Sequence, residues 1–333
     1  MKIETRRGHL TVLADSLELD WPFAKGRVAC PDAVHHEALL SAAFDESLAR
    51  GYVEEEASIH GAMACAMRPH RLWTAGAASH REAFPTLSLP HATRIDPPAP
   101  FPRLANPARG VYPVVDSQGL LETLLEAGAK IIQLRIKDLS TAEQADAVRL
   151  ACRAAEHAPE SQLFINDHWR AALDHGAFGI HLGQEDLLTA DLTAIAAQGV
   201  RLGLSSHSYW EVARAMWLMP SYLACGPVFP TRAKAMNWIP QGLDNLAYWV
   251  SVSRVPVVAI AGIHAGNLEE IAATGADSAA VIQAIVSMPS PAAAYRDLQD
   301  RWVSAAGSRS LGPASQVAPH PETWPARPTL SPA

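Results

Sequence analysis

Four short segments carry polar side chains at the points where apolar, β-branched runs end. They are QLRIKD at 133–138, FINDHW at 164–169, HLGQED at 181–186 and GPVFPTRAK at 226–234. Side chains at the carboxyl ends of successive parallel strands gather at one edge of a sheet or one mouth of a barrel. The pattern therefore predicts an enzyme with its active site at such an edge.

The first of these segments predicts an anion-binding site. Alternate residues of a strand share a face, so Gln133, Arg135 and Lys137 should point together, while Leu134 and Ile136 face the covering helices. Arginine binds phosphate through two parallel hydrogen bonds, and lysine acts as a point charge. We expect a polyanion cradle beside one neutral amide. A solvated strand end paired with acidic residues is the alternative.

Two acids follow the next two strands. Asp167 comes directly after Asn166, and Asp186 lies in GQED. Adjacent strands would bring the two carboxylates together, and hard oxygens beside a phosphate cradle suit Mg²⁺. Helix capping is the alternative for either acid taken alone.

The later strands predict a second anion site. Thr231 and Lys234 lie on a loop stiffened by Pro227 and Pro230, while AIAGIHAGN and VIQAI bring small residues and free backbone N–H groups to the same mouth. Two anion sites suggest two phosphorylated substrates and an elimination of pyrophosphate. Three histidines near the mouth are interpreted as hydrogen-bonded packing residues: His168, His181 and His207.

A regular alternation of strand and helix patterns must position these groups. Glycines at helix ends and the absence of a GxGxxG or GxxxxGK[ST] loop favour a (β/α)8 barrel over a doubly wound open sheet. Helices are expected, for example, at 119–127, 141–156, 209–218 and 267–274. The eight strands are expected at 111–115, 131–135, 162–166, 178–182, 201–205, 222–226, 255–261 and 278–282.

Composition sets the remaining expectations. The 333 residues are 49% hydrophobic with a net charge of −7, so no basic surface favours nucleic acid or an anionic membrane. There is no apolar run of transmembrane length, and four scattered cysteines without a secretion signal indicate a cytoplasmic protein. We expect a smaller, mostly helical extension at 1–93 with helical periods at 37–51 and 53–67. A Pro-rich linker at 94–109, the barrel at 110–305 and a disordered tail at 306–333 should follow.

Seven ordered motifs resemble thiamine phosphate synthase, also called thiamin-phosphate pyrophosphorylase. They are GVYPVVDS, QLRIKD, LFINDHWRAAL, GIHLGQEDL, RLGLSSH, GPVFPTRAK with IPQGL, and VVAIAGI, and they extend over about 95–300. The resemblance implies a transferase of thiamine biosynthesis. It would join 4-amino-2-methyl-5-hydroxymethylpyrimidine diphosphate to a thiazole phosphate, carboxylated or plain, and release pyrophosphate without a protein nucleophile.

The resemblance also implies roles for individual residues. Gln133 and Ser205 would contact the pyrimidine diphosphate, and Mg²⁺ would bind Asp167 and Asp186. The diphosphate would be held by Arg135, Lys137, Asn166 and Lys234; with Ser205, the three cations form the expected catalytic set. The thiazole phosphate would be held by Thr231, Arg232, Ala233, Gly262 and the backbone at Ile282 and Gln283.

Three positions depart from the family pattern. Ala233 replaces the second threonine of PTxTK, Ala261 stands where the family often has glycine, and Gln283 stands where serine is usual. These changes predict weaker binding of the thiazole phosphate with intact diphosphate chemistry. They also leave open a non-catalytic, ligand-binding or regulatory barrel of the same pathway. A different phosphate-handling barrel enzyme, which would not need both acids, is a third interpretation.

The N-terminal extension is less informative. Residues 41–67 faintly resemble the C-terminal end of hydroxymethylpyrimidine phosphate kinase, but PDAVHHEAL at 31–39 lacks the Gly-rich anion loop of that kinase. We therefore expect a degenerate remnant or an interaction module without kinase activity. Small-molecule substrates are the expected partners, and a homo-oligomer stays open.

Overall fold

The computed structural model describes residues 2–5, 8–21, 24–67, 72, 77–92, 98–105, 110–231 and 239–307. Of the tail expected to be disordered at 306–333, residues 306 and 307 are helical and the rest lies outside these ranges, as do parts of the expected linker. None of the helices in the described ranges is long and apolar enough to cross a membrane. The four cysteines are buried thiols.

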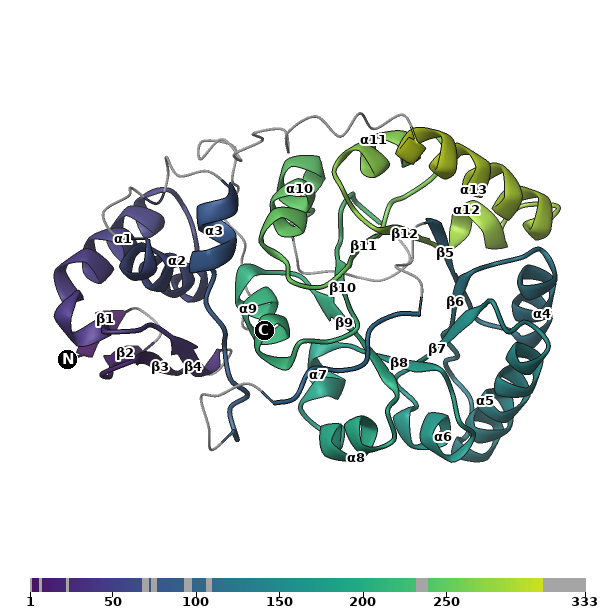
Figure 1. The fold of residues 1–333 in the computed structure, drawn as a ribbon, viewed down its shortest axis with the longest axis horizontal. Coiled ribbons are helices and arrows are strands. Elements are labelled where there is room, and N and C mark those ends of the chain that lie inside the picture. The colour runs from purple at the N-terminus through teal and green to yellow at the C-terminus, as the bar shows by residue number, and fades with distance from the viewer. Residues whose placement is uncertain are drawn as a thin grey trace.

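Eight parallel strands close into a barrel in the order β10-β11-β12-β5-β6-β7-β8-β9, with helices around the outside (Figure 1). The predicted (β/α)8 architecture is therefore confirmed. The strands are β5 (Gly110–Val115), β6 (Ile131–Leu134), β7 (Gln162–Asn166), β8 (Gly179–Leu182), β9 (Arg201–Ser206), β10 (Tyr222–Cys225), β11 (Val257–Ile260) and β12 (Ser278–Val281). The helices are α4 (Gln118–Glu126), α5 (Thr141–Glu156), α6 (Trp169–Asp174), α7 (Gln184–Leu187), α8 (Leu192–Ala197), α9 (Tyr209–Leu218), α10 (Gly242–Val252), α11 (Leu268–Ala273), α12 (Gln283–Val286) and α13 (Pro291–Gly307).

Aromatic rings fill the barrel below its mouth. Tyr112, Phe164 and Tyr222 contact one another edge to face or at a tilt, with ring centroids 5.1–6.3 Å apart. Gly179 and Gly203 make room for two of these rings, since a Cβ on either would lie 2.3 Å from a ring carbon of Phe164 or Tyr222. The rings therefore form an aromatic floor under the carboxyl ends of the strands.

The N-terminal part combines a sheet with helices. The helices expected from 37 and from 53 are present as α1 (Glu37–Ala49) and α2 (Glu54–Ala66), followed by α3 (Ala77–Ala83). Sequence analysis assigned no strands here, yet an antiparallel meander precedes the helices. It comprises β1 (Lys2–Thr5), β2 (Gly8–Val12), β3 (Ser16–Asp20) and β4 (Lys25–Ala29), with the short helix η1 (Ala33–His35) after it.

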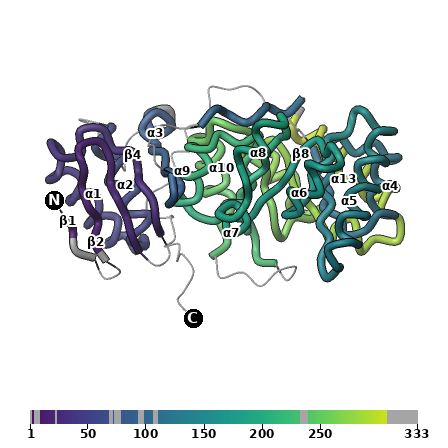
Figure 2. Tube along the Cα trace, turned by 90° about the horizontal axis from the view of Figure 1, so that it is seen from below, coloured from purple at the N-terminus to yellow at the C-terminus, as the bar shows by residue number. Residues whose placement is uncertain are grey.

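This N-terminal part packs on the barrel beside α9 and α10 (Figures 1 and 2). One continuous cluster of buried apolar side chains extends from Leu10 and Leu17 of the small sheet, through α2, to the outer layer of the barrel. The described stretch 98–105 has no regular structure but is held against the base of the barrel. There, Phe101 N–H donates to the Met219 carbonyl, and Leu104 joins the interior cluster.

Candidate active site

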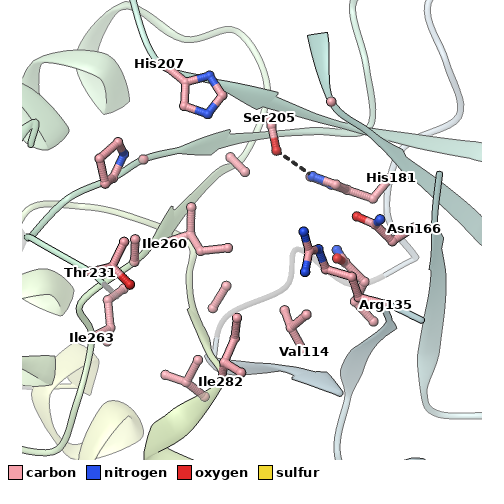
Figure 3. Close-up of a pocket in the computed structure, with 18 of the residues that line it drawn as sticks. Val114, Arg135, Asn166, His181, Ser205, His207, Thr231, Ile260, Ile263 and Ile282 are labelled. Atoms are coloured by element: carbon pink, nitrogen blue, oxygen red, sulfur yellow. Dashed lines mark hydrogen bonds between the residues drawn. The ribbon is translucent and has the colours of Figure 1, made fainter. Parts of the chain in front are cut away.

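A cavity of about 260 Å³ opens at the carboxyl ends of the barrel strands. Figure 3 shows its two sides: Arg135, Asn166, His181 and Ser205 lie on one, and Ile260, Ile263 and Ile282 on the other. Charged and hydrogen-bonding groups are therefore separated from an apolar wall within one pocket. Of the predicted site residues, those lining it are Gln133, Arg135, Asn166, Asp167, Asp186, Ser205, Thr231, Gly262, Ile282 and Gln283.

Strand β6 delivers the first polar pair as predicted. Gln133 is buried with 4% of its surface exposed, and Arg135 follows the last strand residue with its N–H donating to the Val115 carbonyl at 2.7 Å. Leu134 and Ile136 pack in the outer apolar cluster, so the expected alternation of faces is correct for these four residues.

Lys137 differs from the expectation. It is exposed and does not line the cavity: β6 ends at Leu134, and the alternation of faces continues for only two residues beyond it, to Ile136. The chain then turns, and Asp138 adopts a positive φ of 57°. The expected shared face therefore reaches Arg135 but not Lys137.

The two acids approach one another at the cavity edge. Burial and the neighbouring Asp186 carboxylate raise the pKa of Asp167 to about 6, against the opposing effects of Arg135 and Asn166. Asp167 is held in this position by a backbone hydrogen bond from its N–H to the His181 carbonyl at 3.0 Å, with φ of 61°. Two carboxylates this close repel each other unless a cation lies between them.

Helix capping does not account for these acids. The residues at the N-caps of α6 and α7 are His168 and Gly183. Asp186 lies instead in the first turn of α7, and Asp167 precedes the cap of α6. No cluster of three or more His, Cys, Asp or Glu that could hold a metal occurs within the described ranges. A pair of carboxylates nevertheless suits Mg²⁺, which takes one or two from the protein and completes its shell with water and phosphate oxygens.

A chain of hydrogen bonds connects the cavity to the aromatic floor. Gln133 Nε2 donates to Tyr112 Oη at 3.2 Å, and Tyr112 Oη lies 2.9 Å from Tyr222 Oη. His181 Nδ1 lies 2.7 Å from Tyr222 Oη, and its Nε2 lies 2.8 Å from Ser205 Oγ. The chain therefore begins and ends at two predicted site residues, Gln133 and Ser205.

We call this chain of hydrogen bonds, from Gln133 through Tyr112, Tyr222 and His181 to Ser205, the relay. One assignment of donors and acceptors satisfies every group in it. Burial, with Arg135 and His207 nearby, lowers the pKa of His181 to about 3, so its ring is neutral. Since the Gln133 amide can only donate through Nε2, the hydroxyls of Tyr112 and Tyr222 can each pass a hydrogen onward to His181 Nδ1. His181 Nε2–H then donates to Ser205. This order leaves the Ser205 hydroxyl hydrogen and the Gln133 carbonyl oxygen available to a ligand.

The relay includes residues that sequence analysis did not assign to the site. Tyr112 and Tyr222 fell within predicted strands without an assigned role, and His181 was interpreted as a hydrogen-bonded packing residue. That interpretation is correct as far as it goes, because both ring nitrogens are bonded, but His181 also lines the cavity. The available signal was Gly203, which lies opposite Tyr222 in the barrel, because glycine in a strand often marks a close approach.

The opposite side of the cavity contains backbone and small side chains. Gly262 has φ of +70°, and a Cβ there would lie 2.6 Å from Phe229 Cβ, so only glycine fits. Gln283 begins α12 and accepts a hydrogen bond from the Ser287 hydroxyl, which holds its side chain along that helix. Thr231 lines the same side. The predicted residues Arg232, Ala233 and Lys234 lie outside the described residues.

Ala261, where the sequence resemblance leads us to expect glycine, has an unfavourable backbone conformation. Its φ of 79° lies in the left-handed region, where a Cβ is unfavourable. The residue lines the cavity beside Gly262. The departure from the family pattern therefore introduces local backbone strain next to the site.

The chain is similar to proteins of one family. The model of a family described as thiamine monophosphate synthase matches residues 111–285. The thiamine-phosphate synthase of Neisseria meningitidis serogroup A is 47% identical over 192 residues, which is 57% of this chain and 93% of that protein. The Klebsiella pneumoniae thiamine-phosphate synthase is 46% identical over 213 residues, which is 64% of this chain and 96% of that protein.

Among solved structures, the thiamine phosphate pyrophosphorylase from Pyrococcus furiosus superposes with a TM-score of 0.54 at 30% identity. The match covers 62% of this chain and 98% of that one. The family match begins at Val111, so the N-terminal part is outside it. On the barrel, its motifs and these matches, the chain belongs to the thiamine monophosphate synthase family.

Proposed function

We propose that the chain synthesises thiamine phosphate by joining 4-amino-2-methyl-5-hydroxymethylpyrimidine diphosphate to a thiazole phosphate, with loss of pyrophosphate. The observation that carries the proposal is the two-sided cavity, in which Arg135, Asn166 and the acid pair lie opposite an apolar wall. A diphosphate fits the charged side, and a thiazole ring fits the apolar side.

The pyrimidine would be held by the two ends of the relay. The Gln133 oxygen accepts from the exocyclic amino group, and the Ser205 hydroxyl donates to the pyrimidine diphosphate. Because the relay fixes both orientations, the ring is held without reorganisation at the moment of reaction. The aminopyrimidine can stabilise a methylene cation, so departure of pyrophosphate can precede attack by the thiazole nitrogen.

Departure of pyrophosphate requires stabilisation of its growing charge. Arg135 and Asn166 reach the cavity and would bind the diphosphate oxygens. Lys234 is assigned to the same task, and Lys137 would have to contribute from outside the cavity, where its exposed side chain begins. When bound by Asp167 and Asp186, Mg²⁺ would neutralise further charge on the leaving group. The close carboxylate pair, in which burial and the neighbouring Asp186 charge raise the pKa of Asp167, fits such an ion.

The thiazole phosphate would lie against the apolar wall. Gly262 and the backbone N–H groups at Ile282 and Gln283 are at the loops where barrels hold phosphate, and Thr231 adds a hydroxyl. Arg232 and Ala233 belong to the same proposed subsite. The buried thiols fit a reducing compartment, so we place the enzyme in the cytoplasm.

The test is pyrophosphate release by the purified chain, with each substrate alone and with both, in the presence and absence of Mg²⁺. Release that needs both substrates and Mg²⁺, with formation of thiamine phosphate, is expected. Arg135→Gln should abolish most of it, whereas Arg149→Gln, which removes an exposed ion pair with Asp146 on α5, should not. Tight binding without release would instead identify a ligand-binding barrel.

A further inference from the structure

Helix α9 has no solvent-exposed face. All ten of its residues are buried, although an outer helix of a barrel normally turns a polar stripe to water. The N-terminal part covers the side that would otherwise be exposed, and α2 lies against it (Figures 1 and 2). Twelve of the thirteen α2 residues, from Glu54 to Cys65, are buried as well.

A carboxylate from α2 reaches the first turn of α9. Glu56 is 0% exposed, and its Oε1 accepts a hydrogen bond from the Tyr209 N–H at 3.1 Å. The first N–H groups of a helix have no acceptor within the helix, and negative charge is favoured at that end. A side chain from outside the family match therefore completes a helix of the barrel.

The same turn of α9 fixes residues that line the cavity. Ser205, Ser206 and His207 are cavity residues that come just before the helix. Glu211 Oε2 accepts from the His207 N–H at 2.6 Å and lies 2.9 Å from its Nδ1. The Glu211 N–H in turn donates to the Ser208 hydroxyl at 3.3 Å. A shift of this turn would therefore move the 205–207 segment.

A second connection runs through the middle of α9. Arg214 is 6% exposed and donates to Gln184 Oε1 at 3.0 Å, while Gln184 Nε2 donates to the Ser205 carbonyl at 2.7 Å. Gln184 lies two residues before Asp186. A shift of α9 would therefore move Ser205 and the short helix α7, which carries Asp186.

Tyr209 extends the connection to α10. Its hydroxyl donates to Asn245 Oδ1, Asn245 Nδ2 donates to Gln241 Oε1 at 2.8 Å, and Gln241 Nε2 donates to the His207 carbonyl at 2.7 Å. The His60 ring of α2 contacts the Tyr209 ring with centroids 5.8 Å apart. The N-terminal part thus contacts a closed polar circuit at the edge of the cavity.

We propose that Glu56 is a positioning residue of the active site, through which the N-terminal part holds the first turn of α9 and with it residues 205–207. Its kinetic consequences rest on the proposed function. Because these residues lie on the charged side of the cavity, loss of Glu56 affects binding of the pyrimidine diphosphate more than binding of the thiazole phosphate.

The kinetic test compares Glu56→Ala and Glu56→Gln with Glu46→Ala, which removes an exposed ion pair with Arg50 in the same part of the chain. Glu56→Ala should raise KM for the pyrimidine diphosphate roughly tenfold. The reason is that the position of residues 205–207 that binds this substrate loses about one buried hydrogen bond relative to displaced positions. KM for the thiazole phosphate should stay within about twofold. Glu56→Gln keeps an oxygen acceptor and should recover most of the loss, and Glu46→Ala should match the wild type. Equal changes in both KM values, or no rescue by glutamine, would overturn the proposal.

Amide hydrogen exchange provides a readout that does not depend on catalysis. In full-length Glu56→Gln and Glu56→Ala, exchange should accelerate in the peptide covering 205–211, more in the alanine variant, and stay unchanged around β5 and α5. Unaltered protection at 205–211, or a uniform loss across the barrel, would refute the positioning role. If the wild type released no pyrophosphate while this local protection still depended on Glu56, the proposed function would fail and the structural role would stand.

Discussion

Replacing Tyr222 with phenylalanine tests the relay most directly. The change keeps the ring of the aromatic floor but removes the hydroxyl that lies 2.9 Å from Tyr112 Oη and 2.7 Å from His181 Nδ1. Each of these buried groups loses a partner, at about 1–3 kcal/mol apiece, so we expect a loss of roughly 2–6 kcal/mol in the free energy of unfolding. That is a large fraction of the stability of an ordinary domain.

The loss is measured by urea unfolding followed through tryptophan fluorescence. The midpoint should fall by on the order of 1 M with an unchanged m-value. Tyr295→Phe is the matched control, because its hydroxyl lies outside the relay and makes a long, 3.5 Å hydrogen bond to the Gly128 carbonyl. We expect that control to lose less than about 1 kcal/mol.

A double variant sharpens the result. Once Tyr112 is also phenylalanine, no Tyr112 hydroxyl is left to be stranded, so the two changes together should cost less than the sum of the single changes. The Tyr222 variant should also bind the pyrimidine diphosphate more weakly, because the Ser205 hydroxyl is no longer oriented through His181. A cost below about 0.5 kcal/mol for Tyr222→Phe, or strict additivity, would show that the relay is not a connected unit.

Three further predictions concern Ala261, the proposed metal site and the proposed thiazole phosphate subsite. Ala261→Gly should raise the free energy of unfolding by about 0.5–1 kcal/mol, because it relieves a left-handed backbone, whereas Ala259→Gly within β11 should lower it in the same denaturation assay. Asp167→Asn should stabilise the metal-free protein by about 1–2 kcal/mol, allowing for solvent screening, because it removes a carboxylate whose pKa is raised by burial and by repulsion from Asp186. The same variant should lose Mg²⁺-dependent pyrophosphate release, and retained release would contradict the metal assignment. Ala233→Thr combined with Gln283→Ser should lower KM for the thiazole phosphate and leave KM for the pyrimidine diphosphate unchanged; an unaltered KM would show that these positions do not tune that subsite.

The barrel could be predicted from sequence because its signals are local. β7 and α5 have the expected bounds, since apolar runs and a Ser140 capping box mark their ends within a few residues. β11 is shorter than expected: Pro256 lacks a donor, and Ala261 leaves the extended conformation. The small sheet was missed although Leu17 and Leu19 alternate with Glu18 in β3, the pattern of a half-buried strand.

The candidate site was predicted in part for the same reason. Residues at strand ends, such as Gln133 and Asp167, follow from register, because a parallel barrel brings those ends together. Contacts between distant segments do not follow from register. Glu56 and Tyr209 are 153 residues apart, and nothing near either residue in the sequence indicates the other. Lys137 was predicted wrongly for a different reason, because the alternation of faces was extended too far past the end of β6.

The continuous apolar cluster has a consequence for how the protein unfolds. Side chains of the small sheet, of α2 and of the barrel's outer layer bury one another, so neither part can open without exposing the core of the other. Heat or denaturant should therefore produce a single cooperative transition, detected at the same midpoint by far-ultraviolet circular dichroism and by tryptophan fluorescence. Two units joined only by a linker would melt in two steps. In this protein we expect the extension and the barrel to unfold together as one cooperative unit.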